Sequence, residues 1–222
     1  MRLLLSSWYL KPGERPAALP PASRTGRAGI VLNALDQYGC SRARDLPREI
    51  RTWESFGYTC EELDLRDYFS APGELAARLA ALDLVWALGG NAFVLARAMT
   101  QSRFADALRT QQHRHDFVYG GYSAGACVTG PDLRGIDLID DPGVHPDGYP
   151  ADVQPSCLGL VPFRLVPHWR SDHPDAAGAD RAVACLTEAG LRHRCLSDGE
   201  TIGLHTVPGL DGKAPVRSPG RP

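Results

Sequence analysis

The sequence has no long hydrophobic run and almost no net charge. No stretch of the chain approaches the roughly 18 consecutive apolar residues of a membrane helix, so no membrane partner is expected. The formal net charge is −2, which gives no electrostatic attraction to nucleic acid. With 43% hydrophobic and 23% charged residues among 222, the composition is typical of a globular protein that buries a sizeable core.

The sequence also has no paired cysteine motif, and its opening residues are not expected to form a secretory leader. The six cysteines are scattered, and none forms a C-x-x-C pair. The opening MRLLLSSWYL has a shorter apolar run than a signal peptide and no following cleavage pattern, so it is better explained as a first buried strand. We therefore expect a cytoplasmic protein with reduced thiols.

Apolar segments alternate with helical patterns along the chain. Strands are predicted at 2–10, 29–36, 58–65, 83–90, 116–125 and 158–169, with short late strands at 193–198 and 200–207. Helices are predicted at 44–57, 73–82, 92–109 and 174–190. This alternation predicts an α/β fold of three layers, in which helices cover both faces of a mostly parallel sheet. We expect one domain, 1–207, followed by a disordered tail, 208–222, that is rich in proline, glycine and arginine.

The segment GGYSAGA contains the pattern G-x-S-x-G around Ser123. At a junction between a strand and a helix, this pattern is typical of a nucleophile elbow, in which a sharp turn exposes the serine hydroxyl. Gly121 and Gly125 provide the small residues that such a turn needs. The predicted helix after the serine would direct its free N–H groups toward the serine, and the N–H of Ala124 could stabilise an oxyanion. A turn without any chemistry is the alternative.

A second glycine turn, ALGGN, ends the preceding predicted strand. The carboxyl ends of parallel strands meet at one edge of a sheet, where ligands bind, so the two turns should lie together. Gly90 could present a second oxyanion donor. Asn91 is better explained as the cap of the following helix, with a role in substrate binding as a weaker alternative.

A serine nucleophile needs a base and a carboxylate that orients it. His168 follows an apolar strand and should emerge near the site, with His173 as the reserve candidate. The pair His113 and His115 has the spacing of metal ligands, but a third ligand is not evident, so a solvated helix end is the better explanation. The candidate acids are Asp137, Asp140, Asp141 and, more remotely, Glu200.

The segments ALGGN, GGYSAGA, an Asp-Pro loop and VPHW, in that order, resemble the peptidase E family of aspartyl dipeptidases, to which cyanophycinase is related. The resemblance covers roughly residues 2–205. It implies a flavodoxin-like fold similar to that of class I glutamine amidotransferases, with a serine in place of their cysteine. It also implies a serine peptidase that hydrolyses short peptides with an N-terminal aspartate and needs no metal or organic cofactor.

The resemblance also assigns roles to individual residues. Ser123 would be the nucleophile and His168 the base, with Gly90 and Ala124 as the oxyanion donors. The family places its acid shortly before a proline in the loop after the elbow helix, and the segment IDDP matches at Asp140.

An aspartate substrate requires a cationic or donor-rich pocket, for which Arg170 is a candidate. The expected partner is a small peptide. A homodimer is compatible with the sequence, which does not define the oligomeric state. An α/β-hydrolase-type esterase and a non-catalytic amidotransferase-like binding domain are the two alternative functions.

Overall fold

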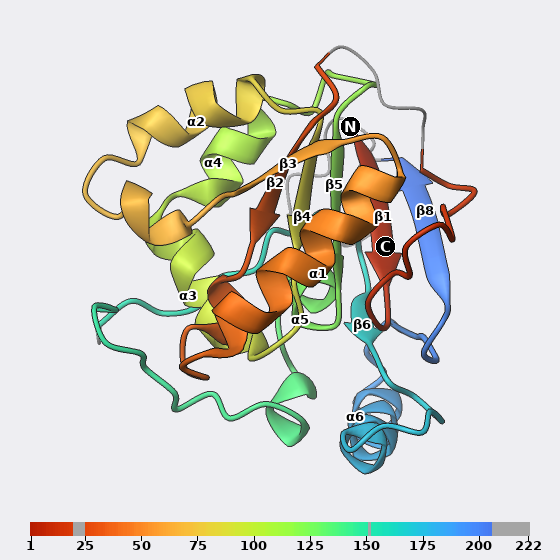
Figure 1. Cartoon of the computed structure of the whole chain (residues 1–222). Coiled ribbons are helices and arrows are strands. Elements are labelled where there is room, and N and C mark those ends of the chain that lie inside the picture. The colour runs from red at the N-terminus through yellow and green to blue at the C-terminus, as the bar shows by residue number, and fades with distance from the viewer. Residues whose placement is uncertain (20–24, 151, 206–222) are drawn as a thin grey trace, which may run out of the picture.

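The main sheet of the protein contains five parallel strands and one antiparallel edge strand. The computed structural model describes residues 1–19, 25–150 and 152–205 (Figure 1). The sheet order is β3-β2-β4-β5-β1-β8, and β8 pairs with β1 in the antiparallel direction. The strands are β1 (Arg2–Ser6), β2 (Arg27–Val31), β3 (Thr59–Glu62), β4 (Leu84–Ala87), β5 (Val118–Tyr122) and β8 (Thr201–His205). The predicted tail, 208–222, lies outside the described residues, so the domain boundary stays a prediction.

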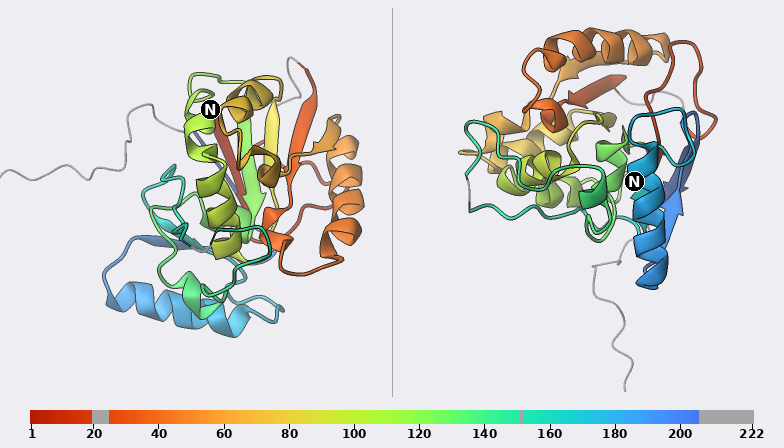
Figure 2. Two further views of the ribbon diagram at one scale, coloured as in Figure 1. Left: turned by 90° about the vertical axis from the view of Figure 1, so that its left-hand side faces the viewer. Right: turned by 90° about the horizontal axis from the view of Figure 1, so that it is seen from below.

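Helices cover both faces of this sheet, as the alternating sequence pattern predicts (Figures 1 and 2). One face carries α1 (Ser41–Ser55), whose Trp53 packs in one apolar cluster with Ile30 and Trp86. The opposite face carries α2 (Gly73–Ala80), α3 (Ala92–Gln101) and α4 (Phe104–Arg109), which pack on the alternate side chains, Val85 among them. Each fully buried aliphatic or aromatic side chain of this kind contributes about 1.5–3 kcal/mol to stability.

A smaller unit lies at the carboxyl ends of the main strands. It consists of the parallel pair β6 (Arg164–Val166) and β7 (His193–Cys195) together with α6 (Ala176–Glu188) (Figure 1). The connecting segments contain one short helix, α5 (Ala124–Cys127), and three 3-10 turns, η1 (Asn33–Leu35), η2 (Leu65–Tyr68) and η3 (Ile136–Leu138). This unit brings late segments of the chain to the edge of the sheet where β5 ends.

Most predicted elements are shorter in the structure than in the sequence pattern, and two of the differences have a clear local cause. The predicted helix 92–109 divides into α3 and α4 because Arg103 adopts a left-handed conformation with φ 54°. The hydroxyl of Ser102 donates to the carbonyl of Ala98 over 2.8 Å, a bond that competes with the helical ladder. Within the predicted strand 158–169, only Arg164–Val166 pairs, because the flanking Pro162 and Pro167 have no N–H to donate.

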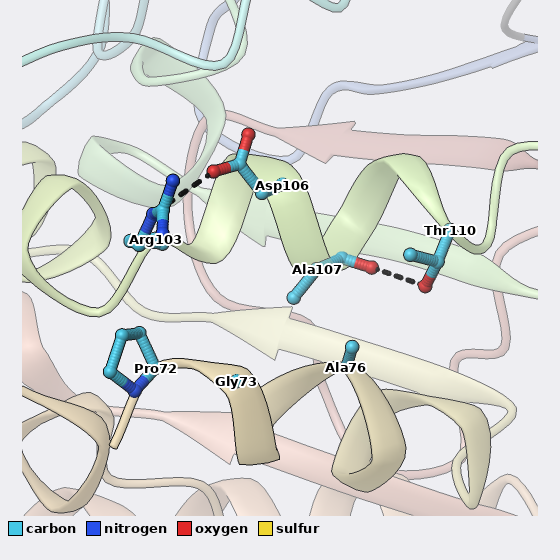
Figure 3. Close-up of a pocket in the computed structure, with 7 residues that line it drawn as sticks. All are labelled: Pro72, Gly73, Ala76, Arg103, Asp106, Ala107 and Thr110. Atoms are coloured by element: carbon cyan, nitrogen blue, oxygen red, sulfur yellow. Dashed lines mark hydrogen bonds and ion pairs between the residues drawn. The ribbon is translucent and has the colours of Figure 1, made fainter.

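A shallow groove of about 250 Å³ lies between α2 and α4 (Figure 3). Its lining residues are Pro72, Gly73, Ala76, Arg103, Asp106, Ala107 and Thr110. Arg103 and Asp106 form an exposed ion pair at 3.3 Å there. The two helices lie toward the edge at which the strands begin, so the groove is separate from the glycine turns (Figure 1).

No helix in the described part of the chain is long and apolar enough to cross a membrane.

Candidate active site

Ser123 occupies a sharp turn between β5 and α5. Its backbone angles are φ 48° and ψ −114°, a conformation that costs a residue with a side chain about 1–3 kcal/mol. The turn is held by the Ser123 N–H, which donates to the carbonyl of Ser6 over 3.1 Å. A Cβ atom added to Gly125 would lie 2.1 Å from the carbonyl oxygen of Ala87, and one on Gly121 would lie 2.8 Å from the Gly125 carbonyl carbon. Both glycines are therefore required by close backbone approach, as the elbow pattern predicts.

The second glycine turn lies against the first. A Cβ atom on Gly89 would be 3.1 Å from the Cβ of Ser123, which places the two turns in contact. Gly90 has φ 133°, and a Cβ atom there would be 2.4 Å from the carbonyl oxygen of Ala34, so no other residue fits. Within the described residues, neither the Gly90 N–H nor the Ala124 N–H donates a backbone hydrogen bond. Both predicted oxyanion donors thus remain available to a ligand.

The helix expected to direct its dipole at the serine is only one turn long. α5 ends at Cys127, four residues after it begins. A macrodipole requires several aligned peptide units, so a helix of this length adds little beyond its individual N–H groups. Any stabilisation of negative charge here depends on the N–H of Ala124 itself.

His168 contacts Ser123 from the other side of the site. It follows the end of β6, it is 1% exposed, and its Nε2 atom lies 3.1 Å from the Ser123 Oγ. Its backbone has φ 59°, again a conformation that side chains rarely adopt. The structure therefore brings the predicted nucleophile and the predicted base within hydrogen-bond distance.

The carboxylate beside His168 is Asp198, which corrects the prediction of Asp140. The Oδ1 atom of Asp198 lies 2.8 Å from the Nδ1 of His168. Asp140 instead accepts a hydrogen bond from the Ala92 N–H over 2.8 Å, at the beginning of α3. The loop after α5 folds back onto α3, so its carboxylates do not reach the histidine. Burial raises the pKa of Asp140 to about 7.

The other candidate acids also have local partners. Asp137 accepts from the N–H of Gly135, Asp141 from that of Gly143, and Glu200 from that of Ser197. The position of Asp198 follows from the pairing of the last strands in the structure. Asp198 follows the short strand β7, and β7 is parallel to β6, so the residues after both strands emerge side by side.

Ser7 links the base to the acid, and the sequence reasoning missed it. Its hydroxyl donates to Asp198 Oδ1 over 2.7 Å and accepts from the backbone N–H of His168 over 2.8 Å. Ser7 directly follows β1, which lies beside β5, so the central sheet positions it next to the elbow. The backbone N–H of Asp198 donates to the hydroxyl of Ser171 over 2.8 Å. Side-chain hydrogen bonds thus fix the acid relative to the histidine.

The surroundings of His168 favour a neutral imidazole. Burial lowers its pKa, and the hydrogen bond with Asp198 opposes this effect without cancelling it. With its Nδ1–H donated to Asp198, the neutral ring presents the lone pair of Nε2 to Ser123. This protonation state is the one that a general base requires.

The reserve candidate, His173, does not contact the serine but stacks on His168. The two ring centroids are 3.7 Å apart and the ring planes differ by 8°. Together with Asp198, these histidines offer ligand atoms within 4.8 Å of one another, the spacing of a metal site. However, Nδ1 of His168 already bonds to Asp198, and parallel rings direct their lone pairs side by side and not toward a common point. The group is therefore a hydrogen-bonded pair, His168 and Asp198, with the ring of His173 stacked on the histidine of the pair.

Two residues considered for substrate binding have other contacts. Asn91 is 1% exposed and caps α3, with Oδ1 accepting from the N–H groups of Phe93 and Val94. Its Nδ2 donates to the carbonyl of Asp141, so the observed contacts of the side chain are those of the cap interpretation. Arg170 is exposed, and its guanidinium lies 4.2 Å from the centroid of the Trp169 ring.

Cys127 is buried in α5, and its Sγ contacts the carbonyl oxygen of Leu165 at 3.4 Å. Burial raises the pKa of this thiol well above its usual value, so it packs as a small apolar residue and not as a nucleophile.

Ser123 contacts His168, and His168 contacts Asp198. These contacts have the geometry of a nucleophile–base–acid triad beside a parallel sheet. The sequence model of peptidase family S51 matches residues 46–202, and the chain belongs to this family. The resemblance to the peptidase E family is thereby confirmed.

Related proteins support the same assignment. The chain is 32% identical over 120 residues to an uncharacterized peptidase of Listeria monocytogenes, covering 53% of this chain and 54% of that protein. It is 35% identical over 102 residues to Peptidase E of Streptomyces coelicolor, covering 46% and 38% respectively. It is 32% identical over 113 residues to the Drosophila melanogaster protein named "Probable alpha-aspartyl dipeptidase", covering 51% and 36%. These alignments span about half of this chain and about half or less of each relative.

Solved structures confirm the fold. A crystal structure of a protein from Listeria monocytogenes superposes with a TM-score of 0.73 at 20% identity, covering 91% of this chain and 93% of that one. The crystal structure of a peptidase from an acI-B1 actinobacterium gives a TM-score of 0.61 at 14% identity, covering 92% and 83%. The α/β three-layer architecture expected from the sequence is therefore correct.

Proposed function

We propose that the chain is a serine peptidase that hydrolyses short peptides, with dipeptides carrying an N-terminal aspartate as its preferred substrates. The observation that carries the proposal is the continuous contact from Ser123 Oγ to His168 Nε2 and from His168 Nδ1 to Asp198. Membership of peptidase family S51 supports peptide hydrolysis. The preference for aspartate is supported by the name of the Drosophila relative alone.

The proposed reaction uses Ser123 as the nucleophile and His168 as the shared acid and base. The Ser123 Oγ forms a bond to the scissile carbonyl carbon while its proton passes to Nε2 of His168. The N–H groups of Gly90 and Ala124 stabilise the oxyanion. His168 then gives the proton to the leaving amine as the C–N bond breaks, and a water molecule releases the acyl group by the same steps in reverse. Asp198 stabilises the imidazolium that forms in each half.

The order of these residues along the chain argues against the esterase alternative. An α/β-hydrolase has its acid between the nucleophile and the histidine, in the order Ser, Asp or Glu, His. Here the carboxylate that contacts the histidine follows it, in the order Ser123, His168, Asp198. The β6–β7 pair that carries the base and the acid is also separate from the main sheet.

The test is hydrolysis of Asp-Leu by the purified full chain, compared with Asn-Leu and with the p-nitrophenyl ester of a short acid. We expect cleavage of Asp-Leu in preference to Asn-Leu, and Ser123→Ala should lower kcat by about 10⁴-fold or more without unfolding the protein. Ester hydrolysis without peptide hydrolysis would indicate the esterase. A Ser123 that does not react with a serine-directed covalent probe would indicate the non-catalytic domain.

Recognition of the aspartate side chain is proposed for Arg170, whose cation is exposed beside the histidine loop. Arg170→Ala should raise the KM for Asp-Leu with little change for Asn-Leu. An unchanged KM for Asp-Leu would remove this residue from the proposal. The cytoplasmic location and the homodimer also stay predictions, to be checked by cell fractionation and by light scattering.

A further inference from the structure

The ring of His173 covers one face of His168 at 3.7 Å and almost parallel. His173 is itself held in place by two neighbours. Its Nδ1 accepts a hydrogen bond from the backbone N–H of Asp175 over 3.1 Å, which makes the neutral ring carry its proton on Nε2. The indole of Trp8 meets His173 edge-on, with the centroids 4.7 Å apart.

The hydrogen bonds of His168 restrain its ring most strongly within the ring plane. Asp198 holds Nδ1 and Ser123 holds Nε2, and ring nitrogens form hydrogen bonds close to the plane of the ring. Tilting of the ring out of this plane is opposed by its covalent attachment at Cβ and by contacts with its faces. His173 supplies a face contact by stacking, and Trp8 adds an edge contact with centroids 5.2 Å apart.

The same contact places two titratable rings together. A protonated His173 would put a positive charge against His168 and oppose the uptake of a second proton. The groups that act on the charge of His168 are Asp198 and Asp175, which favour its protonation, and His173, which opposes it. Burial of His168 acts in the same direction as His173.

We propose that His173 is a positioning residue, whose ring holds the imidazole of His168 in the plane that joins Ser123 to Asp198. This inference rests on the proposed function for its kinetic consequences, since His168 must act as the base. The effect of His173 on the pKa of His168 can be measured without any enzymatic activity.

Two substitutions separate the stacking of His173 from its titratable nitrogens. His173→Phe keeps a flat ring on His168 and removes the titratable nitrogens. His173→Asn keeps an acceptor for the Asp175 N–H and removes the ring. We expect His173→Asn to lower kcat for Asp-Leu by about tenfold or more with little change in KM, because misorientation of a catalytic group slows the reaction itself. His173→Phe should keep a kcat close to wild type at pH 8. His113→Phe, at an exposed histidine before β5, is the matched control and should change nothing.

The second readout is the pKa of His168, measured by NMR titration of its ring protons in the full chain without substrate. Both His173 variants should raise this pKa relative to wild type, and the acid limb of kcat/KM should move to higher pH with it. An unchanged His168 titration in both variants, or a kcat in His173→Asn equal to that in His173→Phe, would overturn the proposal. A wild-type protein that hydrolyses no peptide would contradict the proposed function instead and would leave the titration test intact. Circular dichroism and thermal melts identify a variant that fails to fold, and the other variant then decides.

Discussion

The turn that carries Ser123 and the loop that carries His168 meet at one point, but they are fixed by different forces. The Ser123 turn is shaped by backbone contacts around Gly121 and Gly125, where no side chain fits. The His168 loop is fixed by side-chain hydrogen bonds through Ser7 and Asp198. Changes to the glycines of the turn should therefore damage the fold, whereas changes at the loop should damage the chemistry and leave the fold intact.

Among the residues of the loop side, the largest effect on activity is expected at Asp198. Asp198→Asn should lower kcat/KM for Asp-Leu by about 10⁴-fold, because an amide no longer stabilises the imidazolium or holds its tautomer. The free energy of unfolding should change little, since Asp198 is partly exposed and the amide fills the same space. Steady-state kinetics would check the loss of activity, and urea unfolding of the same variant would check the free energy of unfolding. A variant that keeps more than a tenth of the wild-type activity would contradict the role of Asp198.

On the turn side, the largest effect on stability is expected from a single methyl group. Gly125→Ala places a Cβ 2.1 Å from the Ala87 carbonyl oxygen, so the backbone of β4 or β5 must shift. We expect a loss of about 3 kcal/mol or more in the free energy of unfolding, at the upper end for overpacked sites. Gly73→Ala is the control, because a Cβ there meets nothing within 4 Å. Equal unfolding midpoints for the two variants would refute the steric account of the elbow.

A smaller effect is expected where the loop contacts the central sheet, at Ser7. Ser7→Ala removes the acceptor of the His168 N–H and the donor to Asp198 but leaves the bond between those two residues. We expect kcat/KM to fall by about tenfold to a hundredfold, consistent with about 1–3 kcal/mol for an unsatisfied buried group. Ser171→Ala, which removes the acceptor of the Asp198 N–H and a long donor contact with the Trp169 carbonyl but touches no bond of His168 itself, should have a milder effect. If Ser171→Ala lowered kcat/KM more than Ser7→Ala in the same assay, Ser7 would not be the residue that connects His168 with Asp198.

Sequence reasoning placed the local parts of the site and missed the parts that depend on pairing between distant segments. The elbow and the glycine turn before it are contiguous patterns, and His168 follows its own strand, so each could be predicted from neighbouring residues. Asp198 becomes adjacent to His168 only through the β6–β7 pair, a small second sheet that strand patterns do not reveal. Ser7 was hidden inside a predicted strand, 2–10, that in fact ends at Ser6.

The error at Asp140 has a physical cause of the same kind. An Asp-Pro loop after the elbow helix places a carboxylate in the right part of the fold, and Asp140 is indeed buried there. Its oxygen is nevertheless used by the Ala92 N–H at the beginning of α3, because that helix end has unsatisfied donors. Sequence alone does not show which of two nearby donors a buried carboxylate contacts.

A separate effect, on stability alone, is the pH dependence expected from Asp140. The pKa of this carboxyl is raised from 3.8 to about 7 in the folded protein, so the native state retains a proton that the unfolded chain releases. Between about pH 4 and pH 7 this group should therefore lower stability as the pH rises, by at most about 1.4 kcal/mol per pH unit. In Asp140→Asn this contribution should disappear. Urea unfolding of both proteins at several pH values tests it, and identical pH profiles would contradict it.

The central claim is that Asp198, and not Asp140, holds Nδ1 of His168, and proton NMR of the full chain without substrate tests it most directly. The Nδ1–H of His168 should give a low-field resonance at neutral pH, because this proton is shared with a carboxylate at 2.8 Å. We predict that the resonance persists in Asp140→Asn and disappears or moves strongly upfield in Asp198→Asn. A resonance that survives in Asp198→Asn and is lost in Asp140→Asn would contradict the account.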